Sequence, residues 1–231
     1  MRTPRTKLRR KPSRGSHDRA TIEAILDEAL VSHLGFLDAG SPVVIPTLHV
    51  RVGAHVYLHG SAASRALRES KGAAVCLTAT LVDGLVLARA AMHHSANYRS
   101  AMLFGAGEWI EEEEEKLAAL EALVEKLVPG RWGDARIPTA KELRATALLR
   151  IPLEEASAKL RTGPPIDDDE DMGLAVWAGV VGLRTVAEEA EPDPLLAAGI
   201  EPPAYLGELL RKRVGSARQG SNQGSGDYGS V

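Results

Sequence analysis

The sequence predicts a mainly β fold with flanking helices, in the α+β class, and three observations lead there. Between residues 33 and 110, short apolar runs alternate with turn residues, which is typical of closely spaced strands. Apolar residues repeat at helical spacing in flanking segments. The chain has 231 residues, 44% of them hydrophobic, and is long enough to bury one sizeable core. Six strands in about 80 residues predict a barrel or a sandwich.

The expected elements follow one another closely along the chain. Strands are expected over 33–38, 42–50, 54–59, 73–81, 85–91 and 98–110, then over 146–152, 156–162 and 174–183. Helices are expected over 19–31, 62–71, 111–127 and 139–144. Asp18 and Ser61 are suitable caps for the first two helices. Asp83-Gly84 is expected to turn a hairpin between two of the strands.

The two ends of the chain differ in composition from its middle. Residues 1–17 form a basic arm, and residues 213–231 are rich in Gly, Ser and Gln. Neither end holds enough apolar residues to fold by itself, so both are expected to be disordered around one domain over 18–212. No aromatic residue lies between the charges of the arm to stack on bases, so nucleic acid is not an expected partner.

Cysteine and hydropathy patterns indicate the compartment. Cys76 is the single cysteine and lies in an apolar run, so no intrachain disulfide can form and a reducing environment is expected. No apolar run reaches the roughly 18 residues of a membrane span, and the basic N-terminus lacks the apolar segment of a secretory signal. A cytoplasmic location without membrane contact is the resulting expectation.

A strand passes through a glycine into a predicted helix over residues 58–65. Such a junction directs free backbone N–H groups and the positive end of the helix dipole to one place, which favours a phosphate. Ser61 and Ser64 add hydroxyl donors, and Arg65 adds a planar guanidinium group. An ordinary serine-capped helix with a surface arginine has the same pattern, so both interpretations stay open.

A second polar cluster, residues 89–100, lies between two apolar strands, where core packing does not explain it. Arg99 offers a second cation for a phosphate. His93 and His94 are adjacent, so on extended backbone they point to opposite faces, and no cysteine or carboxylate follows at zinc-like spacing. No metal is therefore expected, although either histidine can donate a proton near a ligand.

A third candidate site involves Thr47, His49 and Trp177. Thr47 and His49 share one face of a predicted strand, and Trp177 follows an acidic loop and can cover a planar ligand. Core packing explains the same residues. The sequence contains neither the Gly-x-Gly-x-x-Gly turn, nor a Walker lysine loop, nor a Gly-x-Ser-x-Gly elbow, which argues against the common nucleotide-binding and hydrolase folds.

As a set, these motifs resemble one family. They cover residues 56–61, 64–65, 75–89, 93–95, 97–100, 159–165 and 176–180. In this order they resemble the nitroimidazole-resistance-type, flavin-nucleotide-binding branch of the pyridoxamine 5'-phosphate oxidase-like family, over roughly residues 20–185. The resemblance implies a six-stranded antiparallel split β-barrel of the FMN-binding type, which forms a homodimer with FMN at the subunit interface.

The resemblance also implies roles for single residues. Ser61, Ser64 and Arg65 would hold the FMN phosphate, with Tyr98 and Arg99 completing that pocket. The flavin ring would be lined by Pro46, Thr47, Cys76, Leu77 and Thr78. Trp177, of the same chain or of the partner chain, would close the site. His59, which also lies beside the cofactor, and His94 are the candidate catalytic proton donors.

The implied activity is that of an FMN-dependent oxidoreductase, similar to a flavin reductase or nitroreductase, with a small-molecule substrate and NAD(P)H as candidate donor. The chain ends in a Gly/Ser/Gln tail, whereas true pyridoxamine phosphate oxidases carry a basic C-terminal region that binds the substrate phosphate, which argues against that reaction.

Three alternatives stay open. One is a flavin-binding or storage protein without catalysis. Another is a deazaflavin or haem protein on the same barrel, with His49, His59, His93 or His94 as the haem ligand. The last is a regulator that contacts nucleic acid through residues 1–19.

Overall fold

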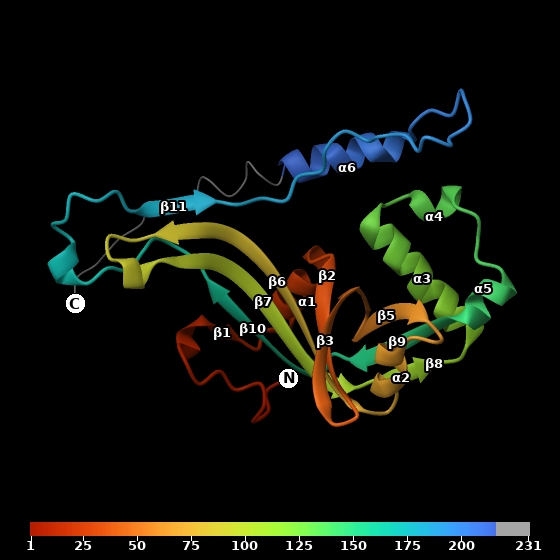
Figure 1. The fold of residues 1–231 in the computed structure, drawn as a ribbon, viewed down its shortest axis with the longest axis horizontal. Coiled ribbons are helices and arrows are strands. Elements are labelled where there is room, and N and C mark those ends of the chain that lie inside the picture. Colours follow the sequence, from red (N-terminus) through yellow and green to blue (C-terminus); the bar gives the residue numbers. More distant parts are fainter. Residues whose placement is uncertain (216–231) are drawn as a thin grey trace.

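Two antiparallel sheets form the body of the protein in a computed structural model, which describes residues 1–215 (Figure 1). One sheet has the strand order β1-β10-β7-β6-β2-β3, with β11 added beside β6, and the other has the order β4-β5-β9-β8. The strands are β1 (Gly15–Ser16), β2 (Val31–Asp38), β3 (Ser41–Leu48), β4 (Val50–Val52), β5 (His55–Ser61), β6 (Ala74–Leu87), β7 (Ser95–Ala106), β8 (Glu108–Ile110), β9 (Thr146–Pro152), β10 (Glu155–Arg161) and β11 (Gly179–Gly182). The predicted fold class is confirmed. Residues 1–215 form eleven strands against the nine expected, because β1, β4 and β8 are short edge strands, while two of the expected strands are joined in β6.

Helices surround the sheets. They are α1 (Arg19–Glu28), α2 (Arg65–Ser70), α3 (Glu113–Leu127), α4 (Arg131–Asp134), α5 (Ala140–Ala145) and α6 (Ala204–Gly215), with short 3-10 helices η1 (Pro12–Arg14), η2 (Ala91–His93) and η3 (Asp169–Asp171). Asp18 caps α1 as predicted, because its carboxylate accepts a hydrogen bond from the Thr21 N–H at 2.8 Å. Among residues 1–215, no helix combines the length and the apolar character that a bilayer span requires.

The hydrophobic core lies between the two sheets. Leu34 of β2 and Leu77 of β6 belong to the same buried cluster as Val56 of β5 and Leu149 of β9, and each is at most 1% exposed. Helix α1 closes this cluster with Ile22 and neighbouring apolar residues. Burial of one such side chain contributes about 1.5–3 kcal/mol. The core therefore fixes which face of each strand points inward.

Asp83-Gly84 does not turn a hairpin, so the prediction of two strands over 73–81 and 85–91 is wrong. β6 is continuous and pairs with β7 on both sides of a bulge between Val82 and Gly84. A Cβ atom at Gly84 would lie 3.0 Å from the carbonyl oxygen of Val181 in β11. The glycine is needed for this close approach of two backbones.

The basic arm over 1–17 has defined structure, contrary to the expected disorder. β1 pairs with β10, Thr6 is 2% exposed, and Arg5 forms an ion pair with Glu155 of β10. The Arg5 guanidinium also lies 5.1 Å from the centroid of the Phe104 ring. The strands of the barrel supply the hydrogen-bond and ion-pair partners of these arm residues. The composition of the arm alone does not predict these contacts. Most of the tail expected to be disordered over 213–231 lies outside the described residues.

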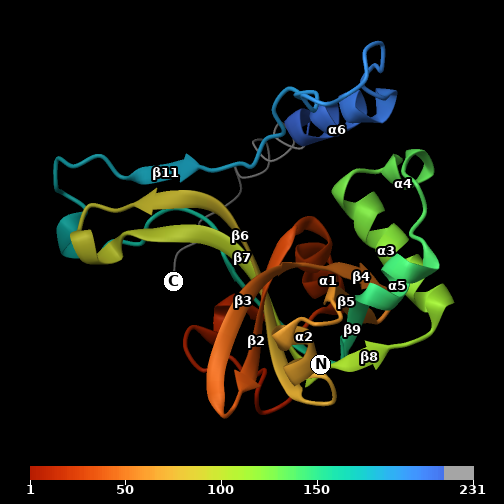
Figure 2. The same cartoon turned by 45° about the vertical axis from the view of Figure 1, so that its right-hand side comes forward.

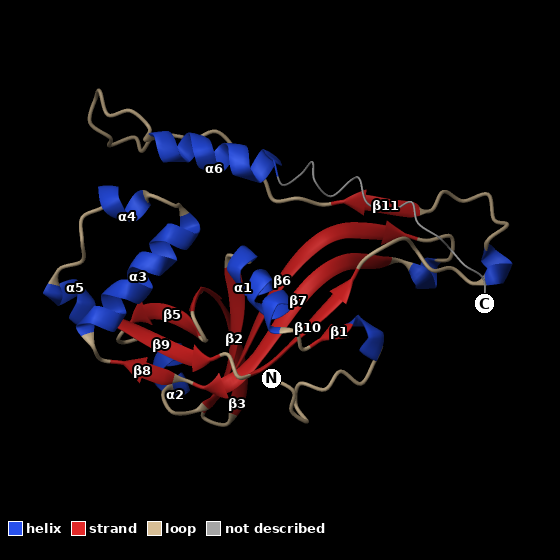
Figure 3. Ribbon diagram, turned by 180° about the vertical axis from the view of Figure 1, so that it is seen from behind, coloured by secondary structure: helices blue, strands red, loops and turns tan. Residues whose placement is uncertain are grey.

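β6 and β7 continue beyond the barrel as a long curved pair, and β11 lies along it (Figures 1 and 2). The predicted strand over 174–183 is thus reduced to β11. From β11 the chain returns past the barrel to α6, which lies near α4 when seen from behind (Figure 3). There Arg131 donates a hydrogen bond to the hydroxyl of Tyr205 at 3.1 Å.

His49, between β3 and β4, connects three elements and is 0% exposed. Its Nε2 lies 2.8 Å from the carbonyl oxygen of Leu26 in α1. Lys126 of α3 donates from Nζ to the carbonyl oxygens of Leu26 at 2.8 Å and of His49 at 3.0 Å. Burial and then the charge of Lys126 lower the pKa of His49 to about 4. The imidazole is therefore neutral at pH 7.

We expect His49 to make the stability of the protein pH-dependent between about pH 6.5 and pH 4. In this window the unfolded chain binds a proton that the folded chain does not, because the folded pKa is about 4 against an ordinary 6.5. The free energy of unfolding therefore falls as the pH falls, by about 3 kcal/mol in total. Urea unfolding measures it.

In that measurement His49→Gln should lack this part of the pH dependence. His33→Gln, at an exposed histidine of β2, is the control and should keep it. If the curves of unfolding free energy against pH are parallel for wild type and His49→Gln, His49 is not the source of this pH dependence.

Candidate functional site

The large sheet has one face that is turned away from the core and carries polar groups. Residues directly opposite each other in register share a face. Pro46 lies opposite His33, His33 opposite Thr78, and Thr78 opposite Met102. We call the resulting surface the outer sheet face. Its residues include Leu37, Val44, His33, Pro46, Cys76, Thr78, Thr80, Val82, Tyr98, Ser100 and Met102.

Strand alternation directs two of the predicted ring-lining residues to the other face. Leu77 is 1% exposed and belongs to the core. Thr47 lies opposite Ser32, which is 0% exposed on the core side of β2. Their side chains therefore do not join Pro46, Cys76 and Thr78. His33 was not predicted for the site, although the alternation of β2 was a signal for it.

The N-terminal arm covers one end of the outer sheet face. Cys76 lies opposite Phe104, which lies opposite Glu155, and Arg5 contacts both Phe104 and Glu155. Burial raises the pKa of the Cys76 thiol, which is neutral at pH 7. Further along the face, the Thr80 hydroxyl donates to the Ser100 hydroxyl at 3.1 Å. The hydroxyl-bearing part of the face is thus separate from the end beneath the arm.

Arg99 is held by two carboxylates. Its Nε and Nη2 donate to Asp83 at 3.0 and 2.7 Å, and its Nη2 also donates to Glu28 of α1 at 2.8 Å. These bonds, those to Glu28 first, raise the pKa of Arg99 further above its ordinary value. Arg99 points to the α1 side of the sheet, whereas its neighbour Tyr98 is on the outer sheet face. Within one chain the charge of Arg99 is compensated, and the two residues do not form one pocket.

The predicted phosphate site is arranged differently from expectation. α2 begins at Arg65 with Ser64 as its N-cap, and the Ser61 hydroxyl accepts a hydrogen bond from the Ala63 N–H at 3.1 Å. Ser61 is therefore not the cap of this helix. The Ser64 hydroxyl makes no capping bond. Arg65 is exposed and forms an ion pair with Asp38, at the end of β2, at 3.0 Å. The three residues do lie together, with one cation and one uncommitted hydroxyl group.

The two predicted proton donors lie far apart in the topology. His59 is in β5 of the smaller sheet, and burial lowers its pKa, so it is neutral at pH 7. Its Nδ1 is buried and has no hydrogen-bond partner among residues 1–215. His94 is exposed between η2 and β7, and its Nδ1 lies 3.2 Å from the carbonyl oxygen of Ala90. Within one chain the fold does not bring them to one site.

A buried ion pair fastens the acidic loop to the end of β6. The Asp167 side chain is 1% exposed and accepts hydrogen bonds from the Arg89 N–H at 2.9 Å, the Ala90 N–H at 3.3 Å and the Arg89 guanidinium at 3.1 Å. Burial would raise the pKa of Asp167, but these hydrogen bonds hold it below its ordinary value. Asp167 is thus a structural carboxylate.

The same loop brings carboxylates to His93. Ligand atoms of His93, Asp168 and Asp171 all lie within 4.8 Å of one another, and His93 Nε2 is 3.2 Å from Asp168 Oδ2. The expectation of no metal relied on sequence spacing, which does not show this contact. The Asp168 side chain is 68% exposed, and exposed groups of this kind satisfy one another and water without an ion, so we assign no metal here.

Trp177 lies between η3 and β11 and is 67% exposed. Its ring packs on Gly179, where a Cβ atom would come within 2.8 Å of the indole. Trp177 is thus on the extension formed by β6, β7 and β11, so a role over a ligand would involve this extension.

The chain belongs to the pyridoxamine 5'-phosphate oxidase family, because the family model matches residues 18–160. Among solved structures, it is similar to the flavocytochrome Anf3 from Azotobacter vinelandii, with 40% identity, a TM-score of 0.86, and coverage of 90% of this chain and 97% of the other. The search of curated proteins found no match.

Two further solved structures are related. The FAD and heme binding protein from Mycobacterium smegmatis is 36% identical, with a TM-score of 0.81 and coverage of 85% of this chain and 97% of that one. A candidate 5-nitroimidazole antibiotic resistance protein from Bacteroides thetaiotaomicron is 26% identical, with a TM-score of 0.52 and coverage of 63% and 85%. The family to which the sequence motifs pointed is confirmed.

We expect Asp167→Ala to release the acidic loop. The substitution leaves the Arg89 guanidinium and two N–H groups without their partner and should lower the free energy of unfolding. Hydrogen exchange of the Arg89 and Ala90 amides should become faster. Asp168→Ala, at a neighbouring exposed carboxylate, is the control, and equal protection of both amides in the two variants would argue against this role of Asp167.

Proposed function

We propose that the protein is a flavin-binding redox protein that works as a homodimer. The observation that carries this proposal is the 40% identity over 90% of the chain to a protein named as a flavocytochrome. The name of the Mycobacterium smegmatis neighbour adds FAD and heme. A bound flavin supplies hydride or electron transfer, and the protein supplies binding, orientation and electrostatics.

The residues present fit a flavin in two respects. The outer sheet face carries the hydroxyl groups of Thr78, Thr80 and Ser100, which suit the polar edge of a planar ring. Arg65 and Ser64 offer a cation and a hydroxyl group for a phosphate, after exchange of the exposed ion pair with Asp38. An exposed pair of this kind contributes only about 0–1 kcal/mol, so a phosphate can displace it.

FMN is the flavin that we propose, following the sequence motifs, and FAD is the alternative because it is named for a 36% identical neighbour. We predict that the protein is an FMN-dependent oxidoreductase that acts on a small-molecule substrate with NAD(P)H as the electron donor. A cytoplasmic location also remains a prediction. The side chains of Thr47, Leu77 and Arg99 point away from the outer sheet face. These residues would therefore contribute to such a site through their backbone, or by supporting residues that contact the flavin.

Haem is a second candidate ligand, which the names of both neighbours favour. His59 suits an iron ligand best of the predicted histidines, because burial keeps its imidazole neutral and its Nδ1 is free of protein partners among residues 1–215. His49 also has a buried Nδ1 without a partner among the described residues, but it does not fit, since it is 0% exposed and its Nε2 lies 2.8 Å from the carbonyl oxygen of Leu26.

A homodimer is proposed from the apolar character of the outer sheet face. Leu37, Val44 and Val82 are 60%, 65% and 50% exposed there. Leu37 and Val44 lie close together on β2 and β3, and Val82 lies on β6 beyond Thr78 and Thr80. Large exposed apolar side chains on one sheet face indicate an interface, and a second copy is the partner that the family resemblance implies. Trp177 of the extension is then available to close the flavin site of the partner subunit.

The visible spectrum of the purified protein tests the cofactors. We expect the two absorption bands of a flavin, with a Soret band in addition if haem is bound. Arg65→Ala should weaken flavin binding about 10-fold or more, because it removes a charged hydrogen-bond donor. Titration with FMN and FAD, followed by quenching of flavin fluorescence, measures the change.

Arg144→Ala is the control for that titration, because Arg144 is exposed and forms no ion pair within residues 1–215. A colourless protein that takes up neither flavin nor haem on reconstitution would contradict the proposed function. Bound flavin that NAD(P)H does not reduce would favour the non-catalytic storage protein instead.

Val44→Asp should convert the dimer into monomers, because it puts a charge among the exposed apolar side chains at the β2–β3 edge of this face. Light scattering after gel filtration measures the mass. Leu195→Asp, at a residue that is 92% exposed away from the sheet, should leave the dimer intact. If wild type is monomeric, or if both variants behave alike, the outer sheet face is not the interface.

A further inference from the structure

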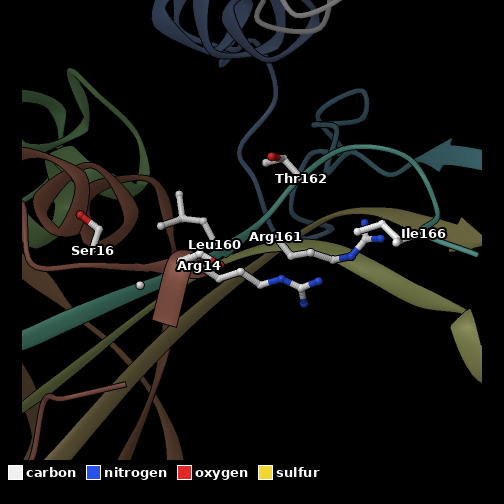
Figure 4. Close-up of a pocket in the computed structure, with 8 residues that line it drawn as sticks. Arg14, Ser16, Leu160, Arg161, Thr162 and Ile166 are labelled. Carbon is white, nitrogen blue, oxygen red and sulfur yellow. The ribbon is translucent and has the colours of Figure 1, made fainter. Parts of the chain in front are cut away.

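A pocket of about 380 Å³ lies where the N-terminal arm meets the end of β10. The arm contributes Ser13, Arg14 and Ser16, and the chain at and after the end of β10 contributes Arg161, Thr162 and Ile166 (Figure 4). The flavin site proposed above, on α2 and the outer sheet face, uses none of these residues. Arg161 lies opposite Tyr98 in the register of β10 with β7, so the pocket adjoins one end of the outer sheet face, but its two arginines have no part in the flavin contacts proposed above.

Arg161 is a buried cation without a carboxylate. It is 5% exposed, and it donates to the side-chain oxygen of Asn97 and to the carbonyl oxygens of Gly163 at 3.1 Å and Pro164 at 3.0 Å. A guanidinium has five N–H donors, so two remain, and the buried Nε has no partner among residues 1–215. A buried charge with unused donors is unfavourable unless an anion compensates it.

Arg14 places a second cation at the same pocket. Its side chain forms no ion pair within the part of the chain that the structure describes, and its guanidinium extends in the same direction as that of Arg161 (Figure 4). Burial first, and then the charge of Arg14, lower the pKa of Arg161. Two neighbouring positive charges that destabilise each other are a place where one anion is stabilised by both.

We propose that this pocket binds a phosphate group carried by a nucleotide, with Arg14 and Arg161 as charged contacts and the hydroxyl groups of Ser13, Ser16 and Thr162 as neutral donors. Two guanidinium groups match the charge of a phosphate better than that of a single carboxylate, and each can donate two parallel hydrogen bonds. The volume exceeds that of a lone phosphate, and Leu160 and Ile166 line the remainder, which suits the rest of a larger ligand.

Two kinds of nucleotide carry this chemistry: a flavin cofactor, and a dinucleotide electron donor. Both FAD and NAD(P)H contain a pyrophosphate, so sodium pyrophosphate is a suitable first probe. The inference rests on the pocket alone, and pyrophosphate binding is measured independently of flavin or haem. A negative result here therefore leaves the proposed function untouched, and failure of that function leaves this inference testable.

Calorimetric titration of the purified full chain with sodium pyrophosphate at low ionic strength is the test. Wild type should bind, and Arg14→Gln should bind at least about 10-fold more weakly, because a charged donor is lost. The side chain of Arg14 has no partner within residues 1–215, so this variant should keep its fold. Pyrophosphate should accordingly raise the Tm of wild type and not that of Arg14→Gln.

Arg10→Gln is the matched control, since Arg10 is an exposed arginine of the same arm and the change in net charge is identical. It should bind pyrophosphate as wild type does. Equal losses in both variants would assign the binding to the diffuse charge of the arm, and no loss in either would exclude the pocket. Both results overturn the proposal, as does succinate binding as tightly as pyrophosphate.

Competition then identifies the source of the phosphate. Displacement of pyrophosphate by FMN or FAD indicates that the pocket holds the flavin phosphate. Displacement by NADPH indicates a site for the electron donor, and weaker displacement by NADH locates the 2'-phosphate there. Displacement by none of these compounds overturns the assignment to a nucleotide.

Discussion

The pairing of β6 with β7 is the constraint on which the rest of the structure depends. The pair keeps one register from Ala74 to Val82 and resumes after a single bulge. Because side chains alternate between faces, this register makes Leu77 part of the core and Thr78 part of the outer sheet face. The same two strands continue beyond the barrel and give β11 an edge to join. Core, candidate flavin surface and extension all follow from one ladder.

Charge compensation separates the arginines of this protein into two groups. Arg99 is held by Glu28 and Asp83, and Arg89 by the buried Asp167, so both are committed to structure. Arg14 and Arg161 have no carboxylate within the described residues, although Arg161 is buried. Counting cations along the sequence does not distinguish these groups. The arrangement of carboxylates in space distinguishes them, and it indicates the pocket at Arg14 and Arg161, which no sequence motif predicts.

Family membership and local geometry contribute different parts of the functional argument. The match over residues 18–160 establishes the family, and the names of similar proteins direct the proposal toward flavin and haem. The geometry then selects among residues: Thr78 and Arg65 are accessible to a ligand, whereas His49 is enclosed between α1 and α3. Since the outer sheet face carries exposed apolar side chains, a second copy of the chain would complete the site in the homodimer that we propose.

The sequence by itself determined the class of the fold, the positions of most helices and strands, the cap at Asp18 and the family, because these depend on local periodicity, local hydrogen bonds and ordered motifs. Only the tertiary structure decided that Asp83-Gly84 is a bulge, since the partner strand lies on both sides of it, and that the basic arm is ordered, since its partners are in β10. It also decided which side of a strand each predicted ligand residue occupies. A register between distant strands sets that side, and no local pattern contains it.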